Sequence, residues 1–334
     1  MDEFLTPEGI YDQIITKLIS RDEAIGRLIS LFEGSDDIRL RARSLEILDK
    51  IVLEKDEIFK FLESCLISDG DWIVRATAAE IMIKTFPIKS ETPIKWAIDN
   101  EKSYPCMLKI FKALENTKRD DTNNLLSFIE DKFLKKYQEQ FNLNKREAIV
   151  LGMLVLIRSD FELFGEIEPD FKFKVEDGHV VELNIEGFQY EIFEGLEMFP
   201  MLKSLEIMGE KLQIVKNLEI LTNLKTLYIY DAEIESIKMF ESLETLEELG
   251  LYNNKISDTS GIEKLTHLKK LDLGCNPITS IEGLDKLTDL TFLNIHFNSG
   301  SGPVSEEKRK KFETIKNKIL SNRARNIMMY LFLD

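Results

Sequence analysis

The sequence contains few cysteines. There are three in 334 residues, and they lie far apart, at Cys65, Cys106 and Cys275. An odd number of widely separated cysteines argues against a disulfide framework and is typical of a reducing compartment. The first residues are acidic and have no long apolar region, so we expect no signal peptide. These observations predict a cytoplasmic protein.

Long apolar runs and positive charge are also scarce. The longest apolar run, residues 148–157, is shorter than the roughly 20 residues that cross a membrane, and we predict a buried core helix there. The chain has 44 Lys and Arg against 60 Asp and Glu, a net charge of −16. Such a chain repels phosphate backbones, so nucleic acid is a poor candidate partner. No transmembrane segment is expected.

The motifs of enzymes and metal proteins are missing. The histidines are His179, His267 and His296; none belongs to an HExxH motif, and there is no CxxC pair. The sequence has no GxGxxG, no GxxxxGK[ST] and no GxSxG. We therefore predict a non-enzymatic protein with no catalytic residues, no cofactor and no metal.

Leucine and isoleucine, by contrast, recur at a fixed interval. The segment LKKLDLGCNPITSIEGLDKLTD, residues 268–289, is one of six copies that start every 22 residues, at 180, 202, 224, 246, 268 and 290. Four positions of the repeat are apolar throughout. The fourth position holds Leu183, Leu205, Leu227, Leu249, Leu271 and Leu293, and the sixth holds Ile185, Ile207, Ile229, Leu251, Leu273 and Ile295. The seventeenth and twentieth positions are apolar in the same way.

The pattern LxxLxLxxNxI at 246–256 and 268–278 resembles the leucine-rich repeat family, in its 22-residue class. The resemblance covers about 180–300. It implies one strand per repeat, stacked into a parallel sheet on the concave side of a solenoid. It also implies that the asparagine at position nine turns inward and satisfies backbone groups. Asn254, Asn276 and Asn298 follow this rule, whereas Phe188, Glu210 and Ala232 depart from it.

Both ends of this array need a cap, because an open end would expose its core. Residues 171–185 predict a β-hairpin that turns at Asp177-Gly178. Ser305 to about Leu333 predicts a helix. Glu306 to Arg325 carries eight basic residues against three acids, a net +5. This basic helix either docks on the acidic body as a cap or contacts an acidic partner, a membrane surface or RNA.

The first half of the chain predicts helices. Residues 24–52 align with 58–86 at a step of 34, a looser copy follows at 93–116, and a helix pair is expected at 125–158. The segment IVRATAA, 73–79, resembles HEAT-type helical repeats. The resemblance implies a ladder of Asp and Arg between repeats, which Asp37 with Arg41 and Asp71 with Arg75 would form.

The predicted fold class is a two-part solenoid, in which all-α HEAT-like helical repeats precede an α/β leucine-rich repeat with a parallel concave sheet. The expected domains are 1–160 for the helical repeats, 161–178 for the junction and start of the hairpin, 179–303 for the leucine-rich repeats, and 304–334 for the capping helix.

Positions three, five and seven of each repeat should face solvent on the concave sheet. Aromatic and acidic residues gather there, which is the composition of a protein interface, although tyrosine is also common in strands for its β-propensity alone. The candidate partner-binding residues are Met208, Tyr228, Tyr230, Tyr252, Phe292 and His296, with Glu206, Glu248 and Asp272 around them.

These residues predict a scaffold or adaptor that binds a protein partner on the concave face. Two alternatives stay open. Short leucine-rich arrays imply, by resemblance, a regulatory subunit of a phosphatase or small GTPase. The basic C-terminal helix allows nucleic-acid or membrane-surface contact instead. The sequence does not identify the partner, the oligomeric state or the relative orientation of the two repeat domains.

Overall fold

The structure is a computed structural model that describes residues 6–51, 54–117, 122–159, 172–186, 195–209 and 218–297, together with residues 306, 310, 313, 314, 317, 329 and 330. The chain divides into two compact units. The helical unit contains Met1–Tyr137 and Ile149–Phe161, and the repeat unit contains Gln138–Ala148 and Glu162–Asp334. The domain limits expected from the sequence stay a prediction.

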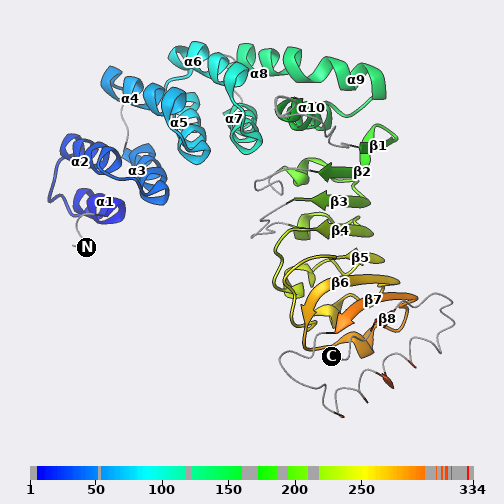
Figure 1. Ribbon diagram of the computed structural model, residues 1–334. Helices are drawn as coiled ribbons and strands as arrows, with labels where there is room; N and C mark the ends of the chain where they lie inside the picture. Colours follow the sequence, from blue (N-terminus) through cyan, green and yellow to red (C-terminus); the bar gives the residue numbers. More distant parts are fainter. Residues whose placement is uncertain are drawn as a thin grey trace. The chain divides into compact units, whose positions relative to one another are not determined.

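The N-terminal half is helical in its described residues (Figure 1). The helices are α1 (Pro7–Ile15), α2 (Arg21–Glu33), α3 (Ile38–Ile51), α4 (Asp56–Ser68), α5 (Trp72–Thr85), α6 (Pro87–Asn100), α7 (Tyr104–Thr117), α8 (Asn123–Ile129), the π-helical turn η3 (Glu130–Leu134), α9 (Lys135–Phe141) and α10 (Lys145–Ser159). Helix α2 packs on α3 and α4 on α5, while α3, α5 and α7 pack in a row. This stacking of helix pairs confirms the helical repeats.

Two aspartates that we expected in the Asp–Arg ladder between the helical repeats cap the starts of helices instead. Asp37 Oδ1 accepts hydrogen bonds from the backbone N–H groups of Arg39 and Leu40, at the start of α3. Asp71 accepts one from Ile73 N–H, at the start of α5. A short acidic side chain satisfies amide groups that the first helical turn leaves unpaired, so both aspartates act as helix caps.

The ladder exists, but with other acids. Arg41 Nη1 lies 2.5 Å from Asp69 Oδ2. Arg75 donates to both carboxylate oxygens of Glu101, at 2.8 Å each. Each arginine therefore pairs with the carboxylate that precedes the second helix of the next repeat by a loop. The predicted acids were wrong. Asp69 and Glu101, in the loops before α5 and α7, pair with the arginines while they also accept backbone N–H groups.

The last helices of this unit approach each other closely. A Cβ atom on Gly152 of α10 would lie 2.6 Å from the backbone oxygen of Phe133, inside the π-helical turn. Only glycine fits at this position. The predicted core helix is also confirmed, because Ala148–Leu154 are buried.

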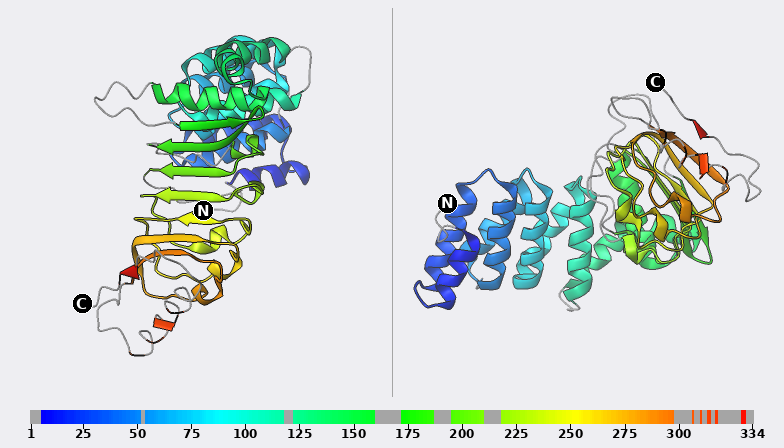
Figure 2. Two further views of the ribbon diagram at one scale, coloured as in Figure 1. Left: turned by 90° about the vertical axis from the view of Figure 1, so that its right-hand side faces the viewer. Right: turned by 90° about the horizontal axis from the view of Figure 1, so that it is seen from below.

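The repeat unit contains one sheet whose described strands follow the order β1 to β8 (Figure 2). They are β1 (Lys172–Glu176), β2 (His179–Glu186), β3 (Ser204–Met208), β4 (Thr226–Tyr230), β5 (Glu248–Gly250), β6 (Lys270–Ile278), β7 (Phe292–Phe297) and β8 (Met329–Tyr330). Strands β2 to β8 are parallel. The pairing register equals the 22-residue period, since Leu205 pairs with Leu227 and Leu249 with Leu271.

The four apolar columns of the repeat form the core. Short 3₁₀ helices carry the seventeenth-position residue of each copy: η5 (Leu196–Met198), η6 (Leu218–Ile220), η7 (Ile237–Phe240), η8 (Ile262–Lys264) and η9 (Leu284–Lys286). The leucine and isoleucine columns of the strands are buried against these turns. One repeat covers only part of its neighbour's apolar surface, so the core is continuous along the array.

Two of the asparagines at position nine of the repeat are buried, as the resemblance implied. Asn254 Oδ1 accepts from the N–H groups of Ala232 and Ile234, and its Nδ2 donates to Ile229 O and Leu251 O. Asn276 Oδ1 accepts in the same way from Ile256 N–H. Asn298 and residues 187–194 and 210–217 lie outside the described residues.

The N-terminal cap is the predicted hairpin. Strand β1 pairs antiparallel with β2 across the turn at Asp177 and Gly178. Gly178 accepts a hydrogen bond from Asn144 N–H at 2.8 Å. The rings of Phe141 and Phe173 meet edge to face, 5.0 Å apart. The segment at 138–148 therefore covers the hairpin at the open end of the array.

At the other end, most of the predicted capping helix lies outside the described residues. Residues 306, 310, 313, 314 and 317 are helical. Met329 and Tyr330, which we expected in the helix, instead form β8, parallel to β7 at Ile295 and His296. Strand pairing satisfies the N–H and C=O groups that β7 would otherwise leave open at the sheet edge.

Candidate functional site

The outward positions of the strands form straight rows across the concave face. Position five runs from Asn184 through Glu206, Tyr228, Gly250 and Asp272 to Asn294, and each residue pairs with the next one. Glu206, Tyr228, Tyr230, Glu248 and Asp272 therefore lie on neighbouring strands of one surface, and Tyr252 follows β5 by two residues. We name the set Glu206, Tyr228, Tyr230, Glu248, Tyr252 and Asp272 the tyrosine–carboxylate cluster.

Tyr228 is the central member of this cluster. Its ring stacks on that of Tyr230, with centroids 5.8 Å apart and an interplanar angle of 17°. The hydroxyl donates to Glu248 Oε2 at 2.5 Å. The ring leans over Gly250 on the next strand, where an added Cβ would lie 2.2 Å from Tyr228 Cδ1. Glycine thus makes the room that lets this tyrosine lie across the sheet rather than stand upright.

Tyr252 repeats this arrangement one strand further along. A Cβ on Gly274 would lie 2.9 Å from Tyr252 Cδ2, so this ring also leans over a glycine. The side chain is 41% exposed and interacts with the thiol of Cys275. Met208, in the row of Tyr230, is 37% exposed. Tyr228 and Tyr230 are half-buried, which is more than the sequence led us to expect.

The carboxylates occupy both sides of the tyrosines. Glu206 Oε2 accepts from the Asn184 amide at 3.1 Å. Asp272 Oδ1 accepts from Asn294 Nδ2 and from Gly274 N–H, both at 2.9 Å. The two donors to Asp272 are uncharged, so they orient this carboxylate without cancelling its charge.

Glu248 has a charged partner, Lys270, at 2.8 Å. Burial opposes ionisation of Glu248, but the bonds from Lys270 and Tyr228 outweigh it and lower the pKa of this carboxyl. Burial, followed by the bond to Glu248, raises the pKa of Tyr228. Burial also raises the pKa of Tyr230 to about 12, with further contributions from Glu206 and Asp272. Both tyrosines therefore stay neutral and can donate hydrogen bonds at neutral pH.

Two predicted residues lie apart from the cluster. Phe292 and His296 are on β7, three strands from β4 in the sheet order. Phe292 is half-buried and pairs with Lys270. Only the backbone of His296 belongs to the described part, so its side chain is not assigned to the surface.

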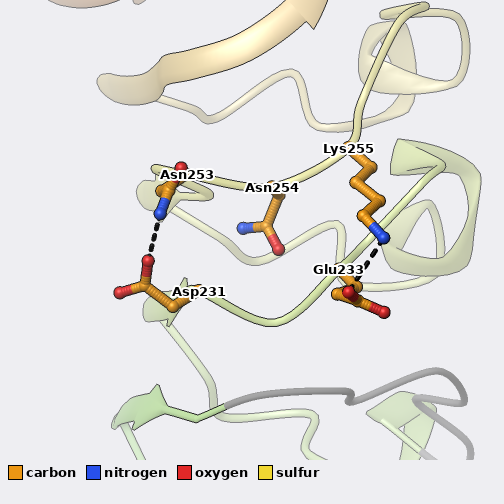
Figure 3. Close-up of a pocket in the computed structure, with 5 residues that line it drawn as sticks. All are labelled: Asp231, Glu233, Asn253, Asn254 and Lys255. Atoms are coloured by element: carbon orange, nitrogen blue, oxygen red, sulfur yellow. Dashed lines mark hydrogen bonds and ion pairs between the residues drawn. The ribbon is translucent and has the colours of Figure 1, made fainter.

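A shallow pocket of about 390 Å³ lies at the ends of β4 and β5, and the sequence did not predict it (Figure 3). Asn253 donates to Asp231, and Lys255 pairs with Glu233 at 2.8 Å. Position eight of these repeats is left-handed, with φ of 55° at Asp231 and 53° at Asn253. Asn and Asp tolerate this conformation, which is the sequence signal for the turn.

In the described part of the chain, no group of three or more histidine, cysteine or acidic side chains is arranged to hold a metal ion. None of the described helices combines the length and apolar character needed to cross a membrane.

The comparisons with known proteins agree with the repeat pattern. Residues 244–286 and 266–305 match the family model described as Leucine Rich repeats (2 copies). The C-terminal half therefore contains leucine-rich repeats. Repeats of this family generally mediate protein interactions and are typically non-enzymatic. No curated protein sequence matches the chain.

Three solved structures of leucine-rich repeat proteins resemble part of the chain. An internalin (inlF) from Listeria monocytogenes is 24% identical over 42% of this chain and 38% of its own, with a TM-score of 0.35. A leucine-rich repeat protein from Leptospira interrogans is 22% identical over 31% and 27%, with a TM-score of 0.29. Internalin C2 from Listeria monocytogenes is 18% identical over 46% and 81%, with a TM-score of 0.32.

This chain thus spans well under two thirds of the length of the first two proteins. At these identities and TM-scores, the likenesses carry no conclusion about function.

Proposed function

We propose that the chain is a non-enzymatic scaffold or adaptor that binds a protein partner through the concave face of its leucine-rich repeats. The observation that carries this proposal is the tyrosine–carboxylate cluster on β3 to β6. Tyrosines supply large contact areas at low entropic cost, and charges belong at the rim of an interface. The buried leucine columns hold these side chains on one rigid surface.

The size of the face also supports this proposal. Strands β2 to β7 provide five spacings of about 4.8 Å, so the rows are about 24 Å long. This length is close to the side of about 28 Å that a square patch of about 800 Å², the area per partner of a standard interface, would have.

The test is affinity capture from a lysate of the source cells with two variants of the whole chain. The first combines Tyr228→Ser, Tyr230→Ser and Tyr252→Ser. The matched control combines Met201→Ser and Ile220→Ser, which replace exposed apolar side chains of the repeat unit outside the strands. Circular dichroism melts verify that both variants are folded. We expect a partner bound by the wild type and by the control, and lost, by at least about tenfold in recovery, from the tyrosine variant.

A partner held equally by both variants would contradict the concave-face proposal and move the site to the helical repeats or the tail. A more specific function, that of a regulatory subunit of a phosphatase or small GTPase, stays a prediction. It is tested by the identity of the captured partner and by assay of the bound fraction for either activity.

Contact with nucleic acid or a membrane surface through the basic tail also stays a prediction. Most of the tail lies outside the described residues. This alternative requires that binding to the nucleic acid or membrane weakens steeply with salt and depends on the basic residues between Lys308 and Arg325.

A further inference from the structure

The concave face has a strong charge bias of its own. Positions three, five and seven of the six repeats carry five carboxylates and one lysine. The acids are Glu182, Glu186, Glu206, Glu248 and Asp272, and the base is Lys270. Because Lys270 pairs with Glu248, the one lysine in these rows is already engaged. The adjoining strand β1 adds Lys172 and Lys174 opposite Asn184 and Glu182, so the excess of carboxylates over lysines lies around Glu206, Glu248 and Asp272.

The tyrosines lie between two of these acids. In the row of position five, Glu206 and Asp272 flank Tyr228 and Gly250. Within the described part, Asp272 is hydrogen-bonded by the uncharged groups of Asn294 and Gly274 alone. The field of both carboxylates reaches the hydroxyl of Tyr230, whose pKa they help to raise. A cation placed over these rings would have a carboxylate on each side.

Aromatic rings beside carboxylates favour one kind of ligand group. The face of a tyrosine ring attracts a cation, and a guanidinium stacks on aromatic rings while its N–H groups donate to carboxylates. An anionic segment would be repelled by the same surface, and a purely apolar one would leave Glu206 and Asp272 buried against it.

We propose that the tyrosine–carboxylate cluster recognises a basic segment of the partner protein, with arginine or lysine side chains over Tyr228, Tyr230 and Tyr252 and between Glu206 and Asp272. This inference rests on the proposed function and specifies the chemistry of its partner. Glycine at 250 and 274 contributes to the site, because a side chain at either position would collide with the ring of Tyr228 or Tyr252.

The test uses fluorescence anisotropy with labelled peptides of about eight residues, since an extended chain of about 3.3 Å per residue then covers the length of the rows. One peptide alternates arginine and serine. The other replaces every arginine by citrulline, which has the same shape and no charge. We expect the arginine peptide to bind about tenfold more tightly than the citrulline peptide at about 0.1 M salt. This difference should shrink at about 1 M salt, because the screening length falls from about 10 Å to about 3 Å.

Two isosteric variants separate this site from general attraction to an acidic protein. Glu206→Gln with Asp272→Asn removes both flanking charges, whereas Glu219→Gln with Glu241→Gln removes two exposed charges at the short helices. We expect the first variant to lose about tenfold in affinity for the arginine peptide and the second to lose less than about twofold. Equal losses, or equal binding of both peptides to the wild type, would overturn the inference.

The same variants distinguish failure of this inference from failure of the proposed function. If the captured partner is lost from the tyrosine variant but held by Glu206→Gln with Asp272→Asn, the concave interface stands and cation recognition does not. If both variants hold the partner, the interface itself is wrong. A third variant, with Lys308, Lys310 and Lys311 replaced by Gln, tests the chain's own basic tail as the occupant. Tighter peptide binding by this variant would overturn the assignment to a separate partner.

Discussion

The hydroxyl of Tyr228 donates a hydrogen bond to Glu248 Oε2 at 2.5 Å, across two neighbouring parallel strands. The bond depends on the repeat, because Tyr228 must lean over Gly250 to reach a carboxylate that lies 20 residues later in the chain. Burial and this bond raise the pKa of Tyr228, and burial raises the pKa of Tyr230 to about 12.

These raised pKa values predict a loss of stability in alkaline solution. Tyrosine in the unfolded chain ionises near pH 10, so above that pH the unfolded state releases protons that the folded state retains. The contribution of both residues is complete below about pH 10 and is lost as the pH rises through the folded pKa values. We expect the urea midpoint to fall less steeply above pH 10 in Tyr228→Phe with Tyr230→Phe than in the wild type. Tyr11→Phe serves as the control, and an unchanged slope would contradict the prediction.

Replacing Asn254 by alanine should destabilise the repeat unit by about 2–4 kcal/mol. The change leaves the buried N–H groups of Ala232 and Ile234 without an acceptor, and each lost partner of this kind costs about 1–3 kcal/mol. Urea denaturation measures the difference. The control is Asn253→Gly, an exposed neighbour at φ 53°, where glycine is tolerated. A similar loss of stability in both variants would show that the hydrogen bonds of Asn254 are not the cause.

Glu147 should be a stabilising residue of the N-terminal cap. Its carboxylate is 1% exposed, accepts from Val180 N–H at 2.6 Å and lies 2.7 Å from His179 Nδ1. Glu147→Ala removes the acceptor of two buried or half-buried groups, which costs about 2–3 kcal/mol. Hydrogen exchange should show loss of protection at the Val180 amide. Glu182→Ala, an exposed carboxylate on the same strand, should change stability by less than about 1 kcal/mol.

Arg75 and Glu101 make a buried ion pair in the helical unit, where the Glu101 side chain is 4% exposed. Arg75→Met leaves that carboxylate without its cation and should cost about 3–5 kcal/mol. Burial alone would raise the pKa of Glu101, but the bonds from Arg75 and the other donors lower it in the wild type. The wild-type pair therefore contributes stability above the unfolded pKa of about 4.3 and loses it as the pH falls through the folded value.

In Arg75→Met the pKa of Glu101 should rise, since burial is then less opposed. The stability difference between the wild type and this variant should consequently shrink as the pH falls from the raised pKa in the variant to the lowered pKa in the wild type. Arg43→Met is the matched control, because its pairs with Glu8 and Glu46 are exposed and should be worth less than about 1 kcal/mol. Thermal unfolding across this pH range measures both effects, and a constant difference would contradict the proposed role of the charge.

Two glycine-to-alanine changes should have opposite signs. Gly152→Ala places a Cβ 2.6 Å from the backbone oxygen of Phe133 and should destabilise the helical unit by about 1–3 kcal/mol. Gly26→Ala, in the exposed face of α2 with nothing within 4 Å, should stabilise by up to about 1 kcal/mol. Thermal melts of the two variants provide the comparison. Destabilisation by both would mean that helix packing does not explain the effect at Gly152.

Much of this fold follows from the sequence alone. A period of 22 determines which residues share a column, and burial follows because only stacked copies can remove their leucines from water. The same period predicted that Tyr228, Tyr230 and Tyr252 lie on one face. It also identified the inward turn of Asn254 and Asn276 through the family pattern.

Tertiary structure decided how the side chains use that arrangement. Arg41 and Arg75 pair with Asp69 and Glu101, in the loops before the next helices, whereas the aspartates that the sequence pattern singled out cap α3 and α5. Residues 329–330 pair with the edge of β7 as a strand, although their sequence pattern predicts a helix.

The lean of Tyr228 depends on the absence of a side chain at position 250, one repeat later, which no local pattern contains. Periodicity in a sequence states which residues share a surface. The space beside each one is set by a neighbour about 22 residues away, and it exists only after the repeats have stacked.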